Sequence, residues 1–106
     1  MGTRMVICTE NPERAKTLAK KAVENRMAAC VQVIDSITSY YWWEEKLTED
    51  NEALLFFKTT EDKVKELIQF IKQNHSYQVP EILSIEINES ESNPDYLSWL
   101  REELSK

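Results

Sequence analysis

The chain has 106 residues, of which 42% are hydrophobic and 30% charged, a composition typical of one soluble globular domain over residues 1–106. Its formal net charge of −6 argues against a nucleic-acid partner and against an anionic membrane surface, because both require a basic face. No apolar run reaches the length of a membrane span. The two cysteines, Cys8 and Cys30, fit neither a disulfide framework nor a CxxC redox motif, which predicts reduced thiols and a cytoplasmic protein.

The first third of the chain predicts a strand followed by a helix. Arg4–Thr9 is a short apolar run, as expected for a buried strand. Asn11-Pro12-Glu13 then supplies a capping side chain, a proline and an acidic residue in the positions that begin a helix. Apolar residues recur at helical spacing from Ala15 to Val23, so the helix should end near residues 25–26.

Residues 28–60 predict an unusually long β-hairpin, with arms at 28–43 and 46–60 that are rich in β-branched and aromatic residues. The run Tyr40-Tyr41-Trp42-Trp43 lies at its fold. Arms of about 13 residues would reach roughly 43 Å at the rise of a strand. A globule of this length is only roughly 30–35 Å across. The hairpin should therefore overhang its own domain, and because an overhanging strand needs a pairing partner, we interpret the sequence as that of an oligomer.

Three more elements follow. A second helix is expected over residues 61–75, capped by Thr59 or Thr60, and a strand over 81–88. Asn93-Pro94-Asp95 repeats the helix-start signal for a short C-terminal helix. The order β-α-β-β-α-β, with this last helix, predicts an α+β ferredoxin-like fold with an antiparallel sheet.

Few side chains carry obvious chemistry. His75, the only histidine, is interpreted either as a capping or surface residue at a helix end or as a ligand contact. Cys8 and Cys30, at similar places on the first two strands, should come near one another, as buried hydrophobes or as metal donors with His75. The aromatic run is interpreted as interface packing or as a pocket wall. No catalytic motif is present, which favours a non-enzymatic function.

Five short motifs occur in order along nearly the whole chain: Ala28-Ala29-Cys30-Val31, Tyr41-x-Trp43-x-x-Lys46, Glu52 followed by Lys58-Thr59, His75-x-Tyr77-x-Val79-Pro80-Glu81-Ile82, and Asn93-Pro94-Asp95-Tyr96-Leu97-x-Trp99-Leu100. Together they resemble the CutA family of divalent-cation tolerance proteins. The resemblance implies a tight homotrimer of ferredoxin-like subunits in the cytoplasm, involved in the response to metal ions and able to bind copper. It also implies clefts between subunits, as in PII-type signalling proteins, where a small ligand would bind.

On this resemblance, Cys30 and His75 are the expected donors for copper or another divalent cation. The expected ligand site, in which the two lysines would hold a small anion, comprises Trp43, Lys46, Glu52, Lys58 and Tyr77. The alternative interpretation is a structural trimeric module that presents a surface to a protein partner.

The chain departs from the family pattern at three positions. Glu45 stands where glycine is usual in the hairpin turn, which predicts a wider tip or a shifted register. Ser76 and Gln78 replace the usual proline and glutamate after the histidine, so one expected carboxylate is lost.

Overall fold

A computed structural model describes residues 2–106 and has the expected α+β order of elements. The strands are β1 (Thr3–Glu10), β2 (Cys30–Trp43), β3 (Lys46–Thr60) and β4 (Ile82–Glu86). The helices are α1 (Pro12–Glu24), α2 (Val64–Asn74) and α3 (Pro94–Leu104), with 3₁₀ turns at Glu61–Lys63 and Glu89–Glu91. None of the helices in the described residues is long and apolar enough to span a membrane.

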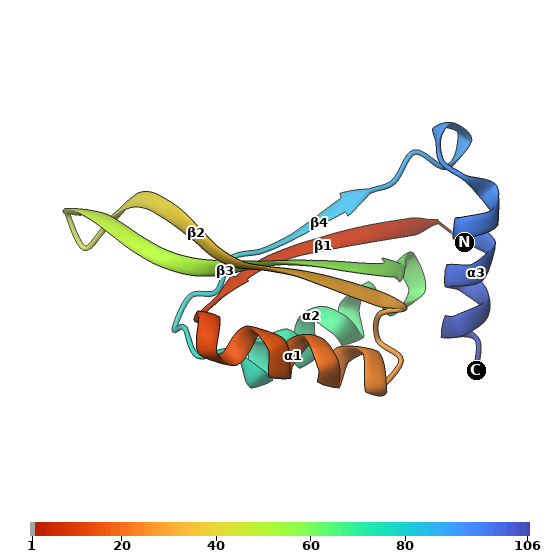
Figure 1. The fold of residues 1–106 in the computed structure, drawn as a ribbon, viewed down its shortest axis with the longest axis horizontal. Coiled ribbons are helices and arrows are strands. Elements are labelled where there is room, and N and C mark those ends of the chain that lie inside the picture. Colours follow the sequence, from red (N-terminus) through yellow and green to blue (C-terminus); the bar gives the residue numbers. More distant parts are fainter. Residues whose placement is uncertain (1) are drawn as a thin grey trace.

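The four strands form one antiparallel sheet in the order β2-β3-β1-β4 (Figure 1). β1 and β2 run in the same direction and are connected through α1, and β3 pairs between them. This is the split βαβ arrangement of ferredoxin-like folds, so the predicted fold class is confirmed.

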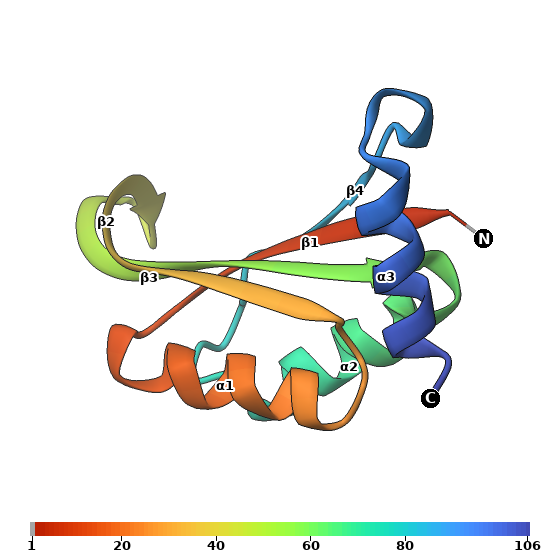
Figure 2. The ribbon, with the colours of Figure 1, turned by 45° about the vertical axis from the view of Figure 1, so that its right-hand side comes forward.

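Helices α1 and α2 cover one face of the sheet, and α3 lies across the end of the sheet near both chain termini (Figures 1 and 2). The buried residues of α1 follow the predicted helical spacing and are mostly alanines, which allow the helix to lie close to the sheet. The core between the helices and the sheet consists of Val6, Cys8, Ala15, Leu18, Ala19, Ala22, Ala28, Ala53, Leu55, Phe57, Leu67 and Ile71.

The predicted caps hold for two helices of three. The side-chain oxygens of Asn11 and Asn93 accept hydrogen bonds from backbone N–H groups at 2.9 and 3.0 Å. The start of the second helix differs, because Glu61–Lys63 form a 3₁₀ turn and the Thr60 hydroxyl donates to the Asp62 carboxylate at 2.5 Å. The last strand is also shorter than predicted, ending at Glu86.

Helix α1 ends in a geometry that glycine usually provides. Arg26 has φ of 55°, its N–H donates to the Val23 carbonyl, and the Met27 N–H donates to the Ala22 carbonyl. The Arg26 guanidinium then donates to the Glu103 carbonyl at 2.9 Å. A strained backbone position therefore directs a side chain that connects α1 to α3.

The hairpin projects beyond the rest of the sheet, as predicted. β1 pairs with β3 only over residues 53–60, so residues 46–52 of β3 pair with β2 alone (Figure 1). The molecule measures 44 × 27 × 22 Å, and the two-stranded arm accounts for its elongation. The expected wider tip is not found, because Glu44 and Glu45 form a two-residue turn between the paired Trp43 and Lys46. The irregularity in the β2–β3 register instead lies between Ile34 and Ile37.

The face of the sheet opposite α1 and α2 is also apolar. Because side chains alternate along a strand, the neighbours of the core residues point to this face, which we call the open face. Leu83 and Ile85 of β4 are 55% and 40% exposed there, and Ile34 of β2 is 46% exposed. Its half-buried members are Met5, Ile7, Leu54 and Phe56.

Cys8 and Cys30 are both free thiols. Cys8 lies in the core between sheet and helices, whereas Cys30 pairs with Lys58 on the open face. The expectation that they come near one another is therefore wrong. An alternating strand places residues on opposite faces according to register, and the register could not be read from the sequence.

Candidate functional site

A cavity of about 630 Å³ lies at the base of the projecting hairpin, against the loop before β4. Both strands of the hairpin, the end of β1 and the loop contribute to its wall. The lining residues are Thr9, Ser39, Tyr40, Tyr41, Trp43, Asp50, Glu52, Tyr77, Gln78, Val79 and Glu81.

The irregularity in β2 determines which residues of the hairpin reach the cavity. Ile34 pairs with Leu54 and Ile37 with Glu52, so β2 has one more residue than β3 between these two pairs. This one-residue bulge moves every later side chain of β2 to the opposite face. As a result Tyr41 and Trp43 fall on the same face as Asp50, and the Tyr41 hydroxyl donates to the Asp50 carboxylate at 3.1 Å. Without the bulge, Tyr40 and Trp42 would share the strand face of Asp50 instead.

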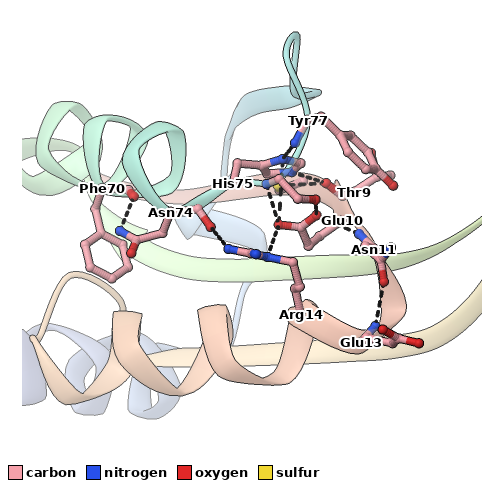
Figure 3. A network of polar contacts seen from close by, with 11 residues as sticks. Thr9, Glu10, Asn11, Glu13, Arg14, Phe70, Asn74, His75 and Tyr77 are labelled. Carbon is pink, nitrogen blue, oxygen red and sulfur yellow. Dashed lines mark hydrogen bonds and ion pairs between the residues drawn. The ribbon is translucent and has the colours of Figure 1, made fainter.

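The loop wall of the cavity is anchored by a buried carboxylate, Glu10, at the end of β1 (Figure 3). Glu10 accepts hydrogen bonds from the Asn11 N–H at 2.7 Å, the Ser76 N–H at 3.1 Å and the Ser76 hydroxyl. Arg14 lies 4.0 Å from it and also donates to the Asn74 carbonyl at 3.3 Å. Ser76, which replaces the family's usual proline, is thus part of the anchor.

His75 is fully buried beneath this loop, and both of its ring nitrogens have backbone partners (Figure 3). Nε2 lies 2.5 Å from the Thr9 carbonyl, and Nδ1 accepts the Tyr77 N–H at 3.0 Å. The Glu10 carboxylate lies 3.7 Å from Nδ1, so the ring is held between the end of β1 and the loop. The Tyr77 ring packs edge-on against the imidazole at 4.7 Å between centroids, so His75 fixes the position of a cavity-lining side chain.

Carboxylates in and beside the cavity raise the pKa of three neighbouring groups. Burial and then the hydrogen bond and charge of Glu52 raise the pKa of Tyr77, with further repulsion from Asp50 and Glu10. Burial and then Asp50 and Glu52 raise the pKa of Tyr41. Burial, followed by the charges of Glu10, Glu81 and Glu52, raises the pKa of the Cys8 thiol to about 12. Tyr77, Tyr41 and Cys8 lie on different elements, yet carboxylates raise the pKa of each, so several carboxylates are gathered in this region.

The structure brings together only part of the expected site. Trp43, Glu52 and Tyr77 line one cavity, and His75 lies directly beneath Tyr77. Lys46 lies at the hairpin tip, outside the cavity lining.

Lys58 and Cys30 form a cross-strand pair level with Met5, whereas His75 contacts Thr9, four residues further along β1. Four residues of strand span about 13 Å. Within one chain, Cys30 and His75 therefore lie too far apart to share a metal ion. Over the whole of residues 2–106, no three His, Cys, Asp or Glu side chains are placed to hold one.

Sequence reasoning missed Glu10, Asp50 and Glu81 as parts of the site. Asp50 could have been found, because it lies two residues from Glu52 and so shares its strand face. Glu10 carries no such signal, because its burial depends on how the distant loop at Ser76 folds over it.

The chain matches the model of a protein family described as CutA1 divalent ion tolerance protein over residues 4–103. The divalent-cation tolerance protein CutA of Thermus thermophilus is 43% identical over 98 residues, covering 92% of this chain and 93% of the relative. The crystal structure of CutA1 from Oryza sativa superposes with a TM-score of 0.91 at 38% identity, covering 97% and 94% of the two chains. The PII-like protein CutA from Nostoc sp. PCC 7120 gives a TM-score of 0.90 at 26% identity, covering 95% and 96%.

Proposed function

This chain belongs to the CutA1 divalent ion tolerance family, and from that premise we propose that it works as a homotrimer in the response to metal ions. In this proposal the trimer binds copper or a small ligand at clefts between its subunits and does not catalyse a reaction. The observation that carries the proposal is the combination of an apolar open face with a hairpin that projects beyond it.

The open face supports the assembly. It exposes large apolar side chains such as Leu83 and Ile85 in one continuous sheet surface, which a solitary subunit would leave in water. The projecting arm has unpaired strand edges and exposed aromatic side chains at Tyr40 and Trp42, both about two-thirds exposed or more. Strand edges of this kind are normally covered by a partner. Three copies arranged around the open faces would cover both features.

The cavity supports ligand binding at a subunit boundary. It opens at the base of the same hairpin arm that lies beyond its own sheet, so a neighbouring subunit paired with the arm would lie beside it. Lys46 and Lys58 lie at opposite ends of β3, about 40 Å apart at the rise of a strand, so a small anion held by both would need lysines from different subunits.

Copper binding through Cys30 and His75 has a strict geometric condition. The two donors do not fit one ion within a single chain, and His75 would have to give up one of its two backbone hydrogen bonds to bind. Any copper site that uses both side chains must therefore combine two subunits. The proposal includes a cytoplasmic location, in which both thiols would stay reduced.

Titration calorimetry with copper and zinc tests the ligand part of this proposal. We expect stoichiometric copper binding by the intact protein that is lost in Cys30→Ser and in His75→Ala. His75→Gln serves as a companion variant, because its amide keeps polar contacts to the backbone while removing the imidazole. Absence of stoichiometric binding would instead favour a structural trimer that presents a surface to a protein partner.

A further inference from the structure

We infer that the cavity at the base of the hairpin binds a small organic cation with two or more separated ammonium groups, such as a polyamine. This inference rests on the proposed function in one respect, namely that a ligand binds at this place. It goes further by assigning the chemical class of that ligand from the side chains that line the cavity.

Charge is the first argument. Every charged side chain in the lining is a carboxylate, from Asp50, Glu52 and Glu81. Within residues 2–106, none of these three carboxylates forms an ion pair with a lysine, arginine or histidine. Glu52 is only 5% exposed, and the Tyr77 hydroxyl beside it carries no charge, so a cation in the cavity would stabilise this carboxylate further. An anionic ligand would meet repulsion from all three.

The aromatic side chains are the second and independent argument. Tyr41 and Trp43 line the cavity yet remain 38% and 44% exposed in the single chain, so the subunit's own packing leaves part of each ring uncovered. Tyr77 contributes a third ring from the opposite wall. Ammonium groups and the methylene groups between them bind well against aromatic rings, with Trp the most favourable. Carboxylates and rings in one cavity thus select an organic cation.

The spacing of the carboxylates argues against a bare metal ion. Asp50 and Glu52 lie two residues apart on one strand face, about 7 Å between Cα atoms. No three acidic or other ligating side chains among the described residues are close enough to hold a metal. Carboxylates separated along a cavity instead match charges separated along a flexible chain.

Binding of spermidine to the full-length protein, followed by calorimetry, tests the inference. We expect saturable binding that weakens by at least about tenfold in Glu52→Gln and in Asp50→Asn, because each removes a charge-assisted contact. Glu49→Gln is the matched control, since Glu49 lies between Asp50 and Thr48 on the same strand, points to the other strand face and is not part of the cavity lining. This control should bind as the wild type does. Because Asp50 is partly exposed, the Asp50→Asn protein should fold, so the test can still be made if Glu52→Gln fails to fold.

Three outcomes would overturn the inference. Equal weakening in Glu49→Gln and Glu52→Gln would mean that spermidine is attracted only by the overall negative charge of the chain. Saturable binding of inorganic phosphate, or of magnesium in preference to spermidine, would assign the cavity to another class of ligand. If spermidine fails to bind while copper binds to a trimer, the inference is wrong and the proposed function stands.

Discussion

Tyr77 connects the buried anchor of the site to its acidic cavity. Its N–H is held by His75, while its hydroxyl interacts with Glu52. Burial, followed by that interaction, raises its pKa above the ordinary value of 10.0, so the folded protein favours the neutral phenol. The resulting stabilisation is complete below pH 10 and is lost as the pH rises through the folded-state pKa.

This predicts an alkaline transition that depends on Glu52. In Glu52→Gln the pKa of Tyr77 should fall towards its ordinary value, because a charge and an acceptor are removed. Tyrosinate absorbance during an alkaline titration measures the shift. Tyr77→Phe should remove one tyrosine from the late-titrating group, to which Tyr41 and Tyr96 also belong because burial raises the pKa of each. Tyr40→Phe should leave that group unchanged. A titration unchanged by Glu52→Gln would contradict the contact.

At the scale of single residues, the sequence predicted which side chains belong to the site better than it predicted their contacts. Trp43, Glu52 and Tyr77 could be selected through the family resemblance, and the structure places all three in one cavity. The burial of Glu10 and the contact of the His75 ring with the Thr9 carbonyl depend on residues 66 apart in the chain. No local pattern contains that information.

Among the elements, the β2–β3 hairpin was predictable in length but not in detail. Its overhang follows from strand rise and domain size, and the structure confirms it. Its one-residue bulge, which selects the aromatic face at the cavity, has no glycine or proline to mark it. The helix caps at Asn11 and Asn93 were predictable because their hydrogen bonds are local.

The hairpin turn carries a measurable strain. Glu44 and Glu45 have φ of 48° and 65°, the left-handed conformation that two-residue turns of this type require. Residues other than Gly, Asn and Asp are strained in this left-handed conformation. We expect Glu45→Gly to raise the free energy of unfolding by about 1 kcal/mol, measured by guanidinium denaturation.

A matched control separates this effect from the removal of a charge. Glu49→Gly, in the regular part of the adjoining strand β3, should lower the free energy of unfolding by about 1 kcal/mol, because glycine weakens a strand interior. Stabilisation by both substitutions would show that lost charge repulsion, and not relief of backbone strain, is responsible.

At the scale of the whole molecule, helices α1 and α2 cover one face of the sheet (Figure 1), and the other face is apolar and uncovered in the single chain. The order of elements was enough to predict a ferredoxin-like subunit and helices on one side. The apolar character of the open face could not be predicted from the sequence. Met5 and Ile7 form one apolar surface with Leu83 and Ile85 because the strand register pairs them, and no local pattern gives that register.

Sedimentation velocity at micromolar concentration tests the proposed assembly most directly. We predict one species with three times the 12.5 kDa mass of the single chain. Ile85→Glu, which places a charge on the open face, should shift it towards monomer, whereas Ser84→Glu on the helix-covered face of the same strand should not. A wild-type protein that sediments as a 12.5 kDa monomer would contradict the trimer and the clefts that depend on it.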